Sequence, residues 1–267
     1  MKKENLATLS ILCVMCIAVM IFAACGKTDS GTQTTTVTTT ETTTTATTTA
    51  ATTTAATTTT ATTAATTKKS GTAVSLADAL FIGDSRTVGI MEYAGIQDAD
   101  FFCNVGMSVF SAQKVRVSVK SVGKVTLKEL LSHKKYGKIY IMLGINELGY
   151  GEKSILNKYG ALVDFIKEQQ PDATVCIEAN LHVSQKRSEG SKSINNPSLN
   201  RLNTALSAFA KERGLLYLDA NTVFDDENGS LPADKTSDGV HLYAKYYARW
   251  GEWIAGETAR LMKEGRA

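Results

Sequence analysis

Ser85, Asp238 and His241 are the residues whose types and spacing suit nucleophilic catalysis. Serine is a poor nucleophile until a base removes its proton, and histidine is the usual base near neutral pH. Asp238 precedes His241 by three residues, so a tight turn lets its carboxylate hold the imidazole in the tautomer that faces Ser85. We therefore predict a Ser-His-Asp triad in which Ser85 is the nucleophile.

A carbonyl attacked by Ser85 also needs hydrogen-bond donors for the oxyanion that forms. Three candidates are the backbone N–H of Ser85, the backbone N–H of Gly106 and the side-chain amide of Asn146. One such donor lowers the barrier by about 3–4 kcal/mol. Glycine suits position 106 because a side chain there would block the approach of a ligand to the backbone.

Five short apolar runs predict the strands that must position these residues. Their near-continuous hydrophobicity is typical of strands buried on both faces, as in a parallel sheet. The runs span residues 79–82, 101–103, 138–143, 174–179 and 215–218. Each of the first three is followed by a polar turn that contains glycine. Because ligands bind beyond the carboxyl ends of such strands, we expect the candidate residues to converge at one edge of the sheet.

Helical patterns separate the apolar runs. Residues 154–169, 198–213 and 243–262 are predicted to form amphipathic helices. Alternation of valine with lysine or serine at 115–125 predicts a small hairpin. The alternation of strands and helices predicts an α/β fold, a three-layer α/β/α sandwich with a mainly parallel sheet of about five strands.

At these residues the sequence resembles the SGNH hydrolases, also called the GDSL esterase family. Four blocks of the family occur in order: Gly83-Asp84-Ser85, then Gly106, then Asn146, and finally Asp238 with His241. The resemblance extends over residues 79–256. It implies a flavodoxin-like sandwich, hydrolysis or transfer of acyl esters, and no metal or organic cofactor.

Four further side chains are candidates for binding substrate. Arg86 stands where the first block usually continues with an apolar residue, and Glu147 stands where the third block usually has Asp. We expect the longer side chain of Glu147 to reach Arg86 near the site. Tyr150 follows the third block, and His182 follows the fourth apolar run, so both are placed to flank the pocket. A loop position without a role is the alternative for His182.

Several other residues are expected to be structural. Asp84 is expected to fix the turn beneath the nucleophile. Cys103 and Cys176 lie in predicted strands, where two buried free thiols and a disulfide between them are both compatible with the sequence. Trp250 and Trp253 are expected to pack the C-terminal helix against the sheet.

The first 71 residues differ in composition from the rest of the chain. Lys2 and Lys3 precede an apolar stretch at 11–24, which predicts a secretory signal over residues 1–25. The stretch ends in a sequence that resembles a bacterial lipobox, which implies that Cys25 carries lipid and tethers the chain to the outer face of the membrane. An uncleaved signal anchor is the alternative. Residues 26–71 are mostly threonine and alanine and are predicted to be a disordered linker.

The remaining residues, 72–267, are enough for one α/β domain with a core. The whole chain has 267 residues and a formal net charge of +3, without a dense block of Lys and Arg. Nucleic acid is therefore not an expected partner. The sequence also lacks a zinc-type cluster of Cys and His, so no metal is expected.

Taken together, the motifs and the N-terminal segments predict an extracellular serine esterase. Its expected partner is an ester substrate, and the favoured one is an O-acetylated carbohydrate or cell-wall glycan, because an anchored enzyme on a spacer meets such polymers. An acyltransferase that passes the acyl group to a sugar hydroxyl is one alternative. A non-catalytic surface binding module with the same fold is another.

Overall fold

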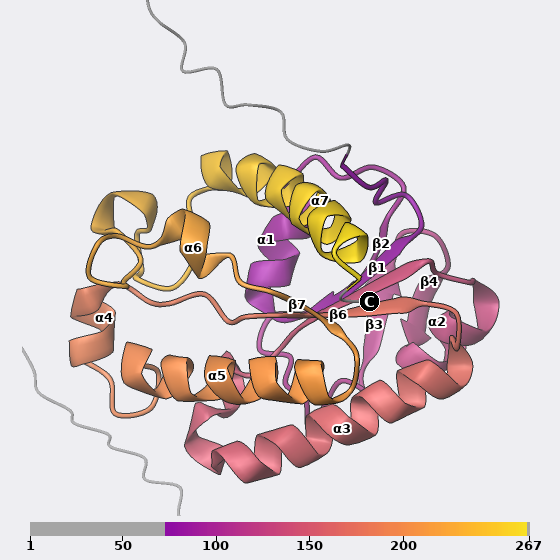
Figure 1. Cartoon of the computed structure of the whole chain (residues 1–267), viewed down its shortest axis with the longest axis horizontal. Helices are drawn as coiled ribbons and strands as arrows, with labels where there is room; N and C mark the ends of the chain where they lie inside the picture. The colour runs from indigo at the N-terminus through magenta and orange to yellow at the C-terminus, as the bar shows by residue number, and fades with distance from the viewer. Residues whose placement is uncertain (1–72, 266–267) are drawn as a thin grey trace, which may run out of the picture. The chain divides into compact units, whose positions relative to one another are not determined.

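A five-stranded parallel sheet forms the centre of the chain in this computed structural model, which describes residues 73–265 (Figure 1). The strands are β1 (Ala79–Gly83), β2 (Asp100–Cys103), β5 (Lys138–Met142), β6 (Thr174–Glu178) and β7 (Leu216–Leu218). All four neighbouring pairs run parallel. The five predicted runs are thus confirmed as strands. The predicted signal, the lipidated Cys25 and the linker at 26–71 lie outside the described residues.

The order of the strands places a crevice at one end of the sheet. Across the sheet the order is β2-β1-β5-β6-β7. Numbered by the sheet alone, this is the 2-1-3-4-5 order of flavodoxin-like folds, in which the chain reverses its direction of winding between the first and third strands. Ligands bind at this switch point because the connections leave the strands in opposite directions there. In this chain the switch point lies between β1 and β5.

Helices cover both faces of the sheet, as predicted for a three-layer sandwich. The main helices are α1 (Ser85–Tyr93), α2 (Leu127–His133), α3 (Glu152–Gln169), α5 (Asn196–Glu212) and α7 (Tyr247–Lys263). Figure 1 shows α1 and α7 on one face and α3 and α5 on the other. Shorter helical segments are α4 (Gln185–Glu189), α6 (Asn221–Phe224), η1 (Ile145–Tyr150), η2 (Ala233–Lys235) and η3 (Ala244–Tyr246).

Side chains of β1 show why the strands are apolar along their whole length. Successive side chains of a strand point to opposite faces. Leu80 and Ile82 belong to the core beneath α2, α3 and α5. Ala79 and Phe81 belong to the core that includes Ile90 of α1 and residues of α7. Because both faces are covered, no position of the strand can be polar without loss of apolar burial.

The predicted hairpin is confirmed by two antiparallel strands, β3 (Arg116–Val119) and β4 (Gly123–Thr126). Thr126 then caps α2, because its hydroxyl accepts the N–H of Glu129 while the Glu129 carboxylate accepts the N–H of Thr126. This reciprocal capping box satisfies two backbone donors at the start of the helix.

The predicted helices at 154–169 and 198–213 correspond to α3 and α5, but the last helix differs from its prediction. Residues 244–246 form the short turn η3, so α7 begins at Tyr247. The helices α1, α2, α4 and α6 were not predicted. None exceeds nine residues, and such short helices offer too few turns for a 3.6-residue period to be recognised.

Both cysteines of the domain are buried and free. Cys103 lies on β2 and Cys176 on β6, with β1 and β5 between them. Three strand spacings separate them, about 14 Å, which is beyond the reach of a disulfide. The alternative of a disulfide is therefore wrong. Trp250 is fully buried in the core of the α1 and α7 face, and Trp253 packs against the same core, as predicted.

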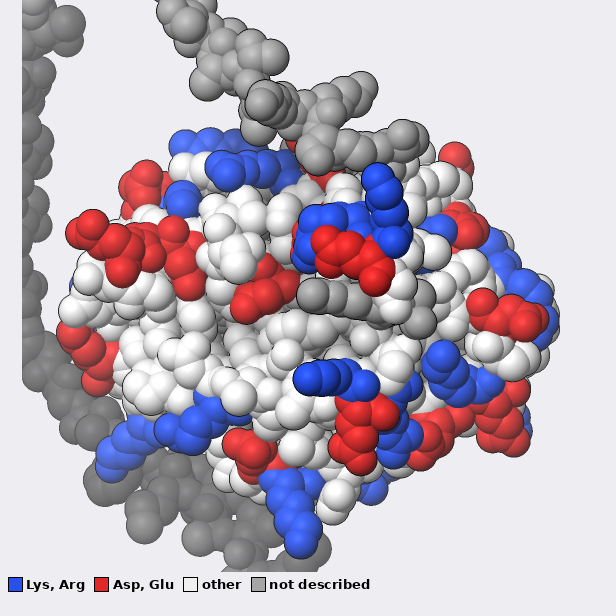
Figure 2. All heavy atoms as spheres, in the orientation of Figure 1, with Lys and Arg blue, Asp and Glu red and all other residues white. Residues whose placement is uncertain are grey.

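Charged side chains of both signs are interspersed on the face that Figure 2 shows. Within residues 73–265, none of the helices is both long and apolar enough to cross a membrane.

Candidate active site

The nucleophile turn follows β1 directly at the switch point. Ser85 is the first residue of α1, and Asp84 caps this helix by accepting the N–H of Arg86 at 2.9 Å. The cap is therefore Asp84, which confirms its structural role. Glycine is required at position 83, because a Cβ there would lie 1.9 Å from Thr87 Oγ1 and 2.8 Å from the carbonyl oxygen of Met142. Ser85 follows this tightly packed turn and is itself half-buried.

Ser85, His241 and Asp238 form a continuous chain of hydrogen bonds. Ser85 Oγ lies 2.8 Å from His241 Nε2, and His241 Nδ1 lies 2.6 Å from Asp238 Oδ2. With Nδ1–H donated to the carboxylate, Nε2 is free to accept the serine proton, which is the arrangement that general-base activation needs. The structure thus brings Ser85 to a His–Asp pair whose histidine lies 156 positions further along the chain.

Asp238 is held in its ionised form by hydrogen bonds. Partial burial would raise its pKa, but bonds from the His241 ring and from the backbone N–H groups of His241 and Val240 hold the pKa well below its usual range. The turn itself depends on Gly239, whose φ is +81°. A Cβ at Gly239 would also lie 2.6 Å from Ser184 Oγ, so a larger residue would displace the turn that carries the His–Asp pair.

The three predicted oxyanion donors lie on three segments at this edge. Ser85 begins α1 after β1, Gly106 lies in the loop after β2, and Asn146 lies in η1 after β5. Gly106 and Asn146 are exposed. Asn146 Nδ2 donates one proton to the carbonyl of Met107 at 2.9 Å, which leaves its second N–H for an oxyanion. Among the described residues, the backbone N–H groups of Ser85 and Gly106 have no acceptor.

The reason for glycine at 106 differs from the one expected. No atom lies within 4 Å of the position that a Cβ would occupy, so a side chain would point into open space. The φ of +74° requires glycine instead, because this left-handed conformation is strained for residues with a Cβ.

Among the described residues, Arg86 does not form the expected ion pair with Glu147, although its charge lowers the pKa of Glu147. Arg86 forms its salt bridge with Asp84 at 3.1 Å, and it also donates to Asn180 Oδ1 at 2.7 Å and to the carbonyl of Leu181. The guanidinium is 1% exposed, and Glu147 is fully buried. Neither side chain can therefore contact a substrate directly, because both lie beneath the surface of the site.

Asn180 is a residue of the site region that the sequence did not reveal as important. Its side chain accepts from Arg86 and from the N–H of Ile145 at 3.1 Å, and donates to the carbonyl of Leu143 at 2.9 Å. It thereby ties the nucleophile turn to the segment that carries Asn146. The sequence feature that could have identified Asn180 is its position directly after the apolar run at 174–179, where a polar residue marks the end of a strand.

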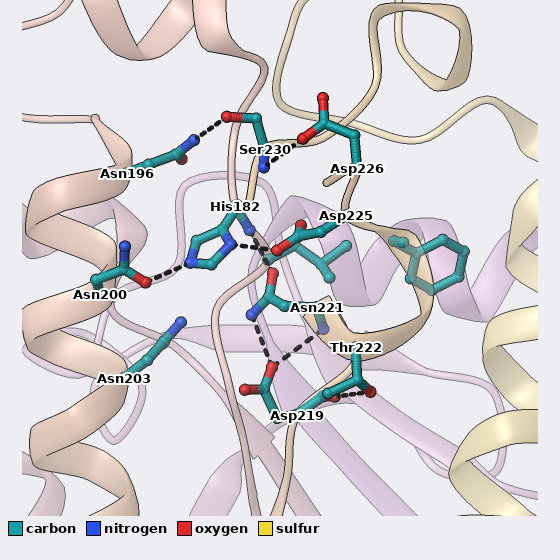
Figure 3. A network of polar contacts seen from close by, with 12 residues as sticks. His182, Asn196, Asn200, Asn203, Asp219, Asn221, Thr222, Asp225, Asp226 and Ser230 are labelled. Atoms are coloured by element: carbon teal, nitrogen blue, oxygen red, sulfur yellow. Dashed lines mark hydrogen bonds and ion pairs between the residues drawn. The ribbon is translucent and has the colours of Figure 1, made fainter. Parts of the chain in front are cut away.

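His182 does not line a substrate pocket. It is 8% exposed, and both ring nitrogens are engaged, Nδ1 with Asp225 Oδ2 at 2.6 Å and Nε2 with Asn200 Oδ1 at 2.8 Å (Figure 3). Burial would lower its pKa, but the bonds to Asp225 and Asn200 raise it. The ring therefore connects α5 to the end of α6, which is a structural role.

We expect His182→Gln to lower the free energy of unfolding by about 1–3 kcal/mol at pH 6, because buried acceptors lose a charged donor. Since the folded-state pKa is raised, the contribution is complete below the unfolded pKa of about 6.5 and is lost as the pH rises through the folded value. Urea unfolding at several pH values measures this. The exposed His133 provides the control His133→Gln, and equal effects of both variants at every pH would contradict the prediction.

Tyr150 remains a candidate for binding substrate. It is 70% exposed at the end of η1, and its ring packs on Phe110 with 5.3 Å between centroids.

Among residues 73–265, no group of three or more His, Cys, Asp or Glu side chains is placed to hold a metal ion.

Comparisons with known proteins identify the family and agree with the fold. Residues 81–249 match the model of the GDSL-like lipase/acylhydrolase family. A provisionally named acylhydrolase from Bacteroides fragilis superposes with a TM-score of 0.52 at 15% identity, over 71% of this chain and 88% of that one. A GDSL-like lipase from Bacteroides thetaiotaomicron superposes with a TM-score of 0.51 at 15% identity, over 70% of this chain and 88% of that one. No curated protein sequence is similar enough to count as a relative.

A flavodoxin-like sheet with Ser, His and Asp at its carboxyl edge defines an α/β hydrolytic protein of the SGNH class. The family match covers more than half of the sequence, from the first strand into the last helix. The chain belongs to the GDSL-like lipase/acylhydrolase family and is an ester hydrolase of that type.

Proposed function

We propose that this protein is an extracellular serine esterase that removes O-acetyl groups from an acetylated carbohydrate or cell-wall glycan. The observation that carries the mechanism is the unbroken chain from Ser85 Oγ through His241 to Asp238, with spacings of 2.8 and 2.6 Å. The family supplies the class of reaction, hydrolysis of acyl esters.

In the proposed reaction Ser85 Oγ attacks the ester carbonyl while His241 Nε2 takes the serine proton. The oxyanion receives hydrogen bonds from the N–H groups of Ser85 and Gly106 and from Asn146. His241 then gives its proton to the leaving sugar oxygen, which leaves the acyl group on Ser85. A water molecule, deprotonated by His241, releases the acid and restores the serine.

The exposure of the site supports a bulky alcohol component. Gly106 and Asn146 are exposed, and the side chains of His241 and Asp238 are 40% and 50% exposed. A site this open at the rim admits an ester that projects from a long polymer, because the polymer need not enter the protein. The exposed ring of Tyr150 lies in the same segment as Asn146 and offers a surface on which a sugar ring can stack.

The extracellular location is proposed from the sequence alone. The basic start, the apolar stretch and Cys25 support export and a lipid anchor, and the threonine-rich segment supports a spacer. Acyl chains on Cys25 would bind the membrane by burying CH₂ groups, each worth about 0.8 kcal/mol. The anchor is tested by following the processing of the full chain in cells. Processing should be blocked by globomycin, an inhibitor of the lipoprotein signal peptidase, and should be absent in the control Cys25→Ser.

Labelling with a fluorophosphonate tests the mechanism, because this probe reacts with activated serines. We expect one adduct on Ser85 and none in Ser85→Ala. A panel of acetylated glycans, assayed for acetate release with and without added sugar acceptors, tests the substrate and separates hydrolysis from transfer. Absence of label, together with aryl acetate turnover no faster than that of Ser85→Ala, would favour a binding module instead.

We expect Tyr150→Ala to raise KM for an acetylated oligosaccharide by about 2- to 12-fold, since aromatic stacking contributes about 0.5–1.5 kcal/mol. The kcat for a small aryl acetate should change less than this KM, because that substrate has no sugar ring to stack on Tyr150. Steady-state kinetics with both substrates measure the difference. Tyr93→Ala is a matched control, because Tyr93 is also exposed and packs on an aromatic ring, that of Tyr247. Equal changes in both variants would exclude a sugar contact at Tyr150.

A further inference from the structure

The two outer donors of the proposed oxyanion hole are carried by segments that no sheet pairing joins. Gly106 follows β2 and Asn146 follows β5, and these strands pair with opposite edges of β1. The hydrogen bonds of the sheet therefore do not set the distance between the loop at 104–115 and η1. Contacts made by side chains must set it.

Three contacts connect the two segments. Asn146 Nδ2 donates to the carbonyl of Met107, and the rings of Phe110 and Tyr150 pack together. The third contact is a hydrogen bond from the N–H of Val109 to Glu147 Oε1. Asn146 and Tyr150 are exposed, so water competes for the hydrogen bond of Asn146, and the packing of the Tyr150 ring removes little apolar area from water. Glu147 is fully buried, and a hydrogen bond away from water is stronger.

Burial makes the charged form of the Glu147 carboxylate unfavourable, which is not expected of a group that only fills the space between two segments. Its Oε2 is buried without a partner among the described residues. Burial raises the pKa of Glu147 to about 7, against the effect of the Val109 N–H. The charged and titratable groups that face it are Asp84, which raises its pKa, Arg86, which lowers it, and Tyr159 of α3. A neutral glutamine would accept the same bond with a smaller desolvation penalty, so the charge itself calls for an explanation.

We propose that Glu147 is a positioning residue of the oxyanion hole: its charged carboxylate holds the Gly106 loop against η1 and so sets the spacing of the Gly106 and Asn146 donors. The inference rests on the proposed function, because it assigns a task only if these two groups stabilise an oxyanion. A charged acceptor forms a shorter and stronger bond with a backbone N–H than a neutral one does. The extra methylene of glutamate, relative to the aspartate usual in the family, gives the reach to Val109.

The proposal predicts a loss of kcat without a loss of binding. A displacement of about 1 Å in a catalytic group can cost about 100-fold in rate. We expect Glu147→Asp, which keeps the charge and shortens the reach, to lower kcat for an aryl acetate by about 30- to 100-fold. We expect Glu147→Gln, which keeps the reach and removes the charge, to lower it by about 10-fold above pH 8. KM should stay within a factor of three in both variants.

The pH dependence of the ratio of the two kcat values, wild type over Glu147→Gln, is the decisive measurement. The titration of the triad is common to both proteins and cancels in the ratio. Below pH 6 the wild-type Glu147 is protonated and resembles glutamine, so the ratio should approach one. The ratio should rise through a pH of about 7, where Glu147 ionises. A flat ratio, or a glutamine variant faster than wild type at high pH, would overturn the proposal.

Glu178→Gln is the matched control, measured in the full chain like the other variants. Glu178 is 3% exposed at the end of β6, its Oε2 also lacks a partner among the described residues, and burial raises its pKa to about 8. Among the described residues, no hydrogen bond joins its side chain to either donor segment, so its replacement should leave kcat and the ratio unchanged. If Glu178→Gln changes both as Glu147→Gln does, the effect belongs to any buried carboxylate and the proposal fails. Should Glu147→Asp not fold, the ratio for the glutamine variant decides alone.

Asn146→Ala separates failure of this inference from failure of the proposed function. Loss of an oxyanion donor costs about 100- to 1000-fold in kcat. If Asn146→Ala shows this loss while both Glu147 variants match wild type, the oxyanion hole stands and the role of Glu147 falls. If Asn146→Ala and Ser85→Ala both retain full activity, the proposed mechanism itself is wrong, and the role of Glu147 is wrong with it.

Discussion

Replacing Ser85 by alanine is expected to lower kcat for an aryl acetate by about 10⁶-fold, which is the size of the loss when the serine of a triad is removed. The reason is the geometry of the nucleophile, whose hydroxyl lies 2.8 Å from His241 Nε2. Without the hydroxyl no acyl-enzyme can form, and the oxyanion donors can assist only direct attack by water. Initial rates and the mass of the fluorophosphonate adduct measure the two consequences.

The same experiment carries its own internal checks. Residues of a triad act as a unit, so Ser85→Ala combined with His241→Ala should be no slower than either single variant. Ser132→Ala, at an exposed position of α2, should behave as wild type. The thermal unfolding temperature of Ser85→Ala should change little, because the hydroxyl is half-buried and its bond is to a partly exposed ring. Residual activity within tenfold of wild type would exclude Ser85 as the nucleophile.

Replacing Arg86 by methionine is expected to reduce the free energy of unfolding by about 3–5 kcal/mol, because it leaves a buried charge without its partner. Asp84 is fully buried, and its Oδ2 pairs with the Arg86 guanidinium at 3.1 Å. Methionine keeps most of the length of the side chain, so the loss reports on charge more than on volume. Asn180 Oδ1 also loses its bond from Arg86. Urea unfolding at pH 7 measures the change.

Two comparisons identify the cause of the loss. If the uncompensated Asp84 charge is responsible, Asp84→Asn combined with Arg86→Met should recover part of the stability that Arg86→Met alone loses. Arg116→Ala removes an exposed ion pair with Glu129, in which the side chains are 49% and 44% exposed, and should cost less than about 1 kcal/mol. A loss below about 1 kcal/mol for Arg86→Met would mean that water or another group replaces the guanidinium beside Asp84.

Activity should fall in Arg86→Met as well, although the side chain cannot touch a substrate. Asp84 accepts the N–H of Arg86 at the start of α1, so a displaced Asp84 carboxylate changes the turn that presents Ser85. The expected change is in kcat, with KM for a small ester nearly constant. A fall in kcat alone would show that Arg86 supports the turn that carries the nucleophile. A rise in KM would instead indicate substrate binding, which is the role that the sequence suggested for Arg86.

Much of this protein was determined by local sequence. The five strands were predictable because each is buried on both faces and so is apolar throughout. That the candidate triad residues and the proposed oxyanion donors lie close together was predictable, because their residue types stand at strand and helix ends, where a parallel sheet gathers them at one edge. These inferences need only short motifs and their order along the chain.

The partners of the buried polar groups were decided by the tertiary structure alone. Arg86 bonds to Asn180, 94 residues away. Glu147 bonds to Val109 across 38 residues, and His182 bonds to Asp225 across 43. Each pairing depends on the direction in which a side chain leaves its backbone and on which strands are neighbours. The sequence could propose Arg86 and Glu147 as partners because they have opposite charges and lie near the same site. Only the packed sheet shows that Asp84 and Asn180 surround the guanidinium while Glu147 turns toward the Gly106 loop.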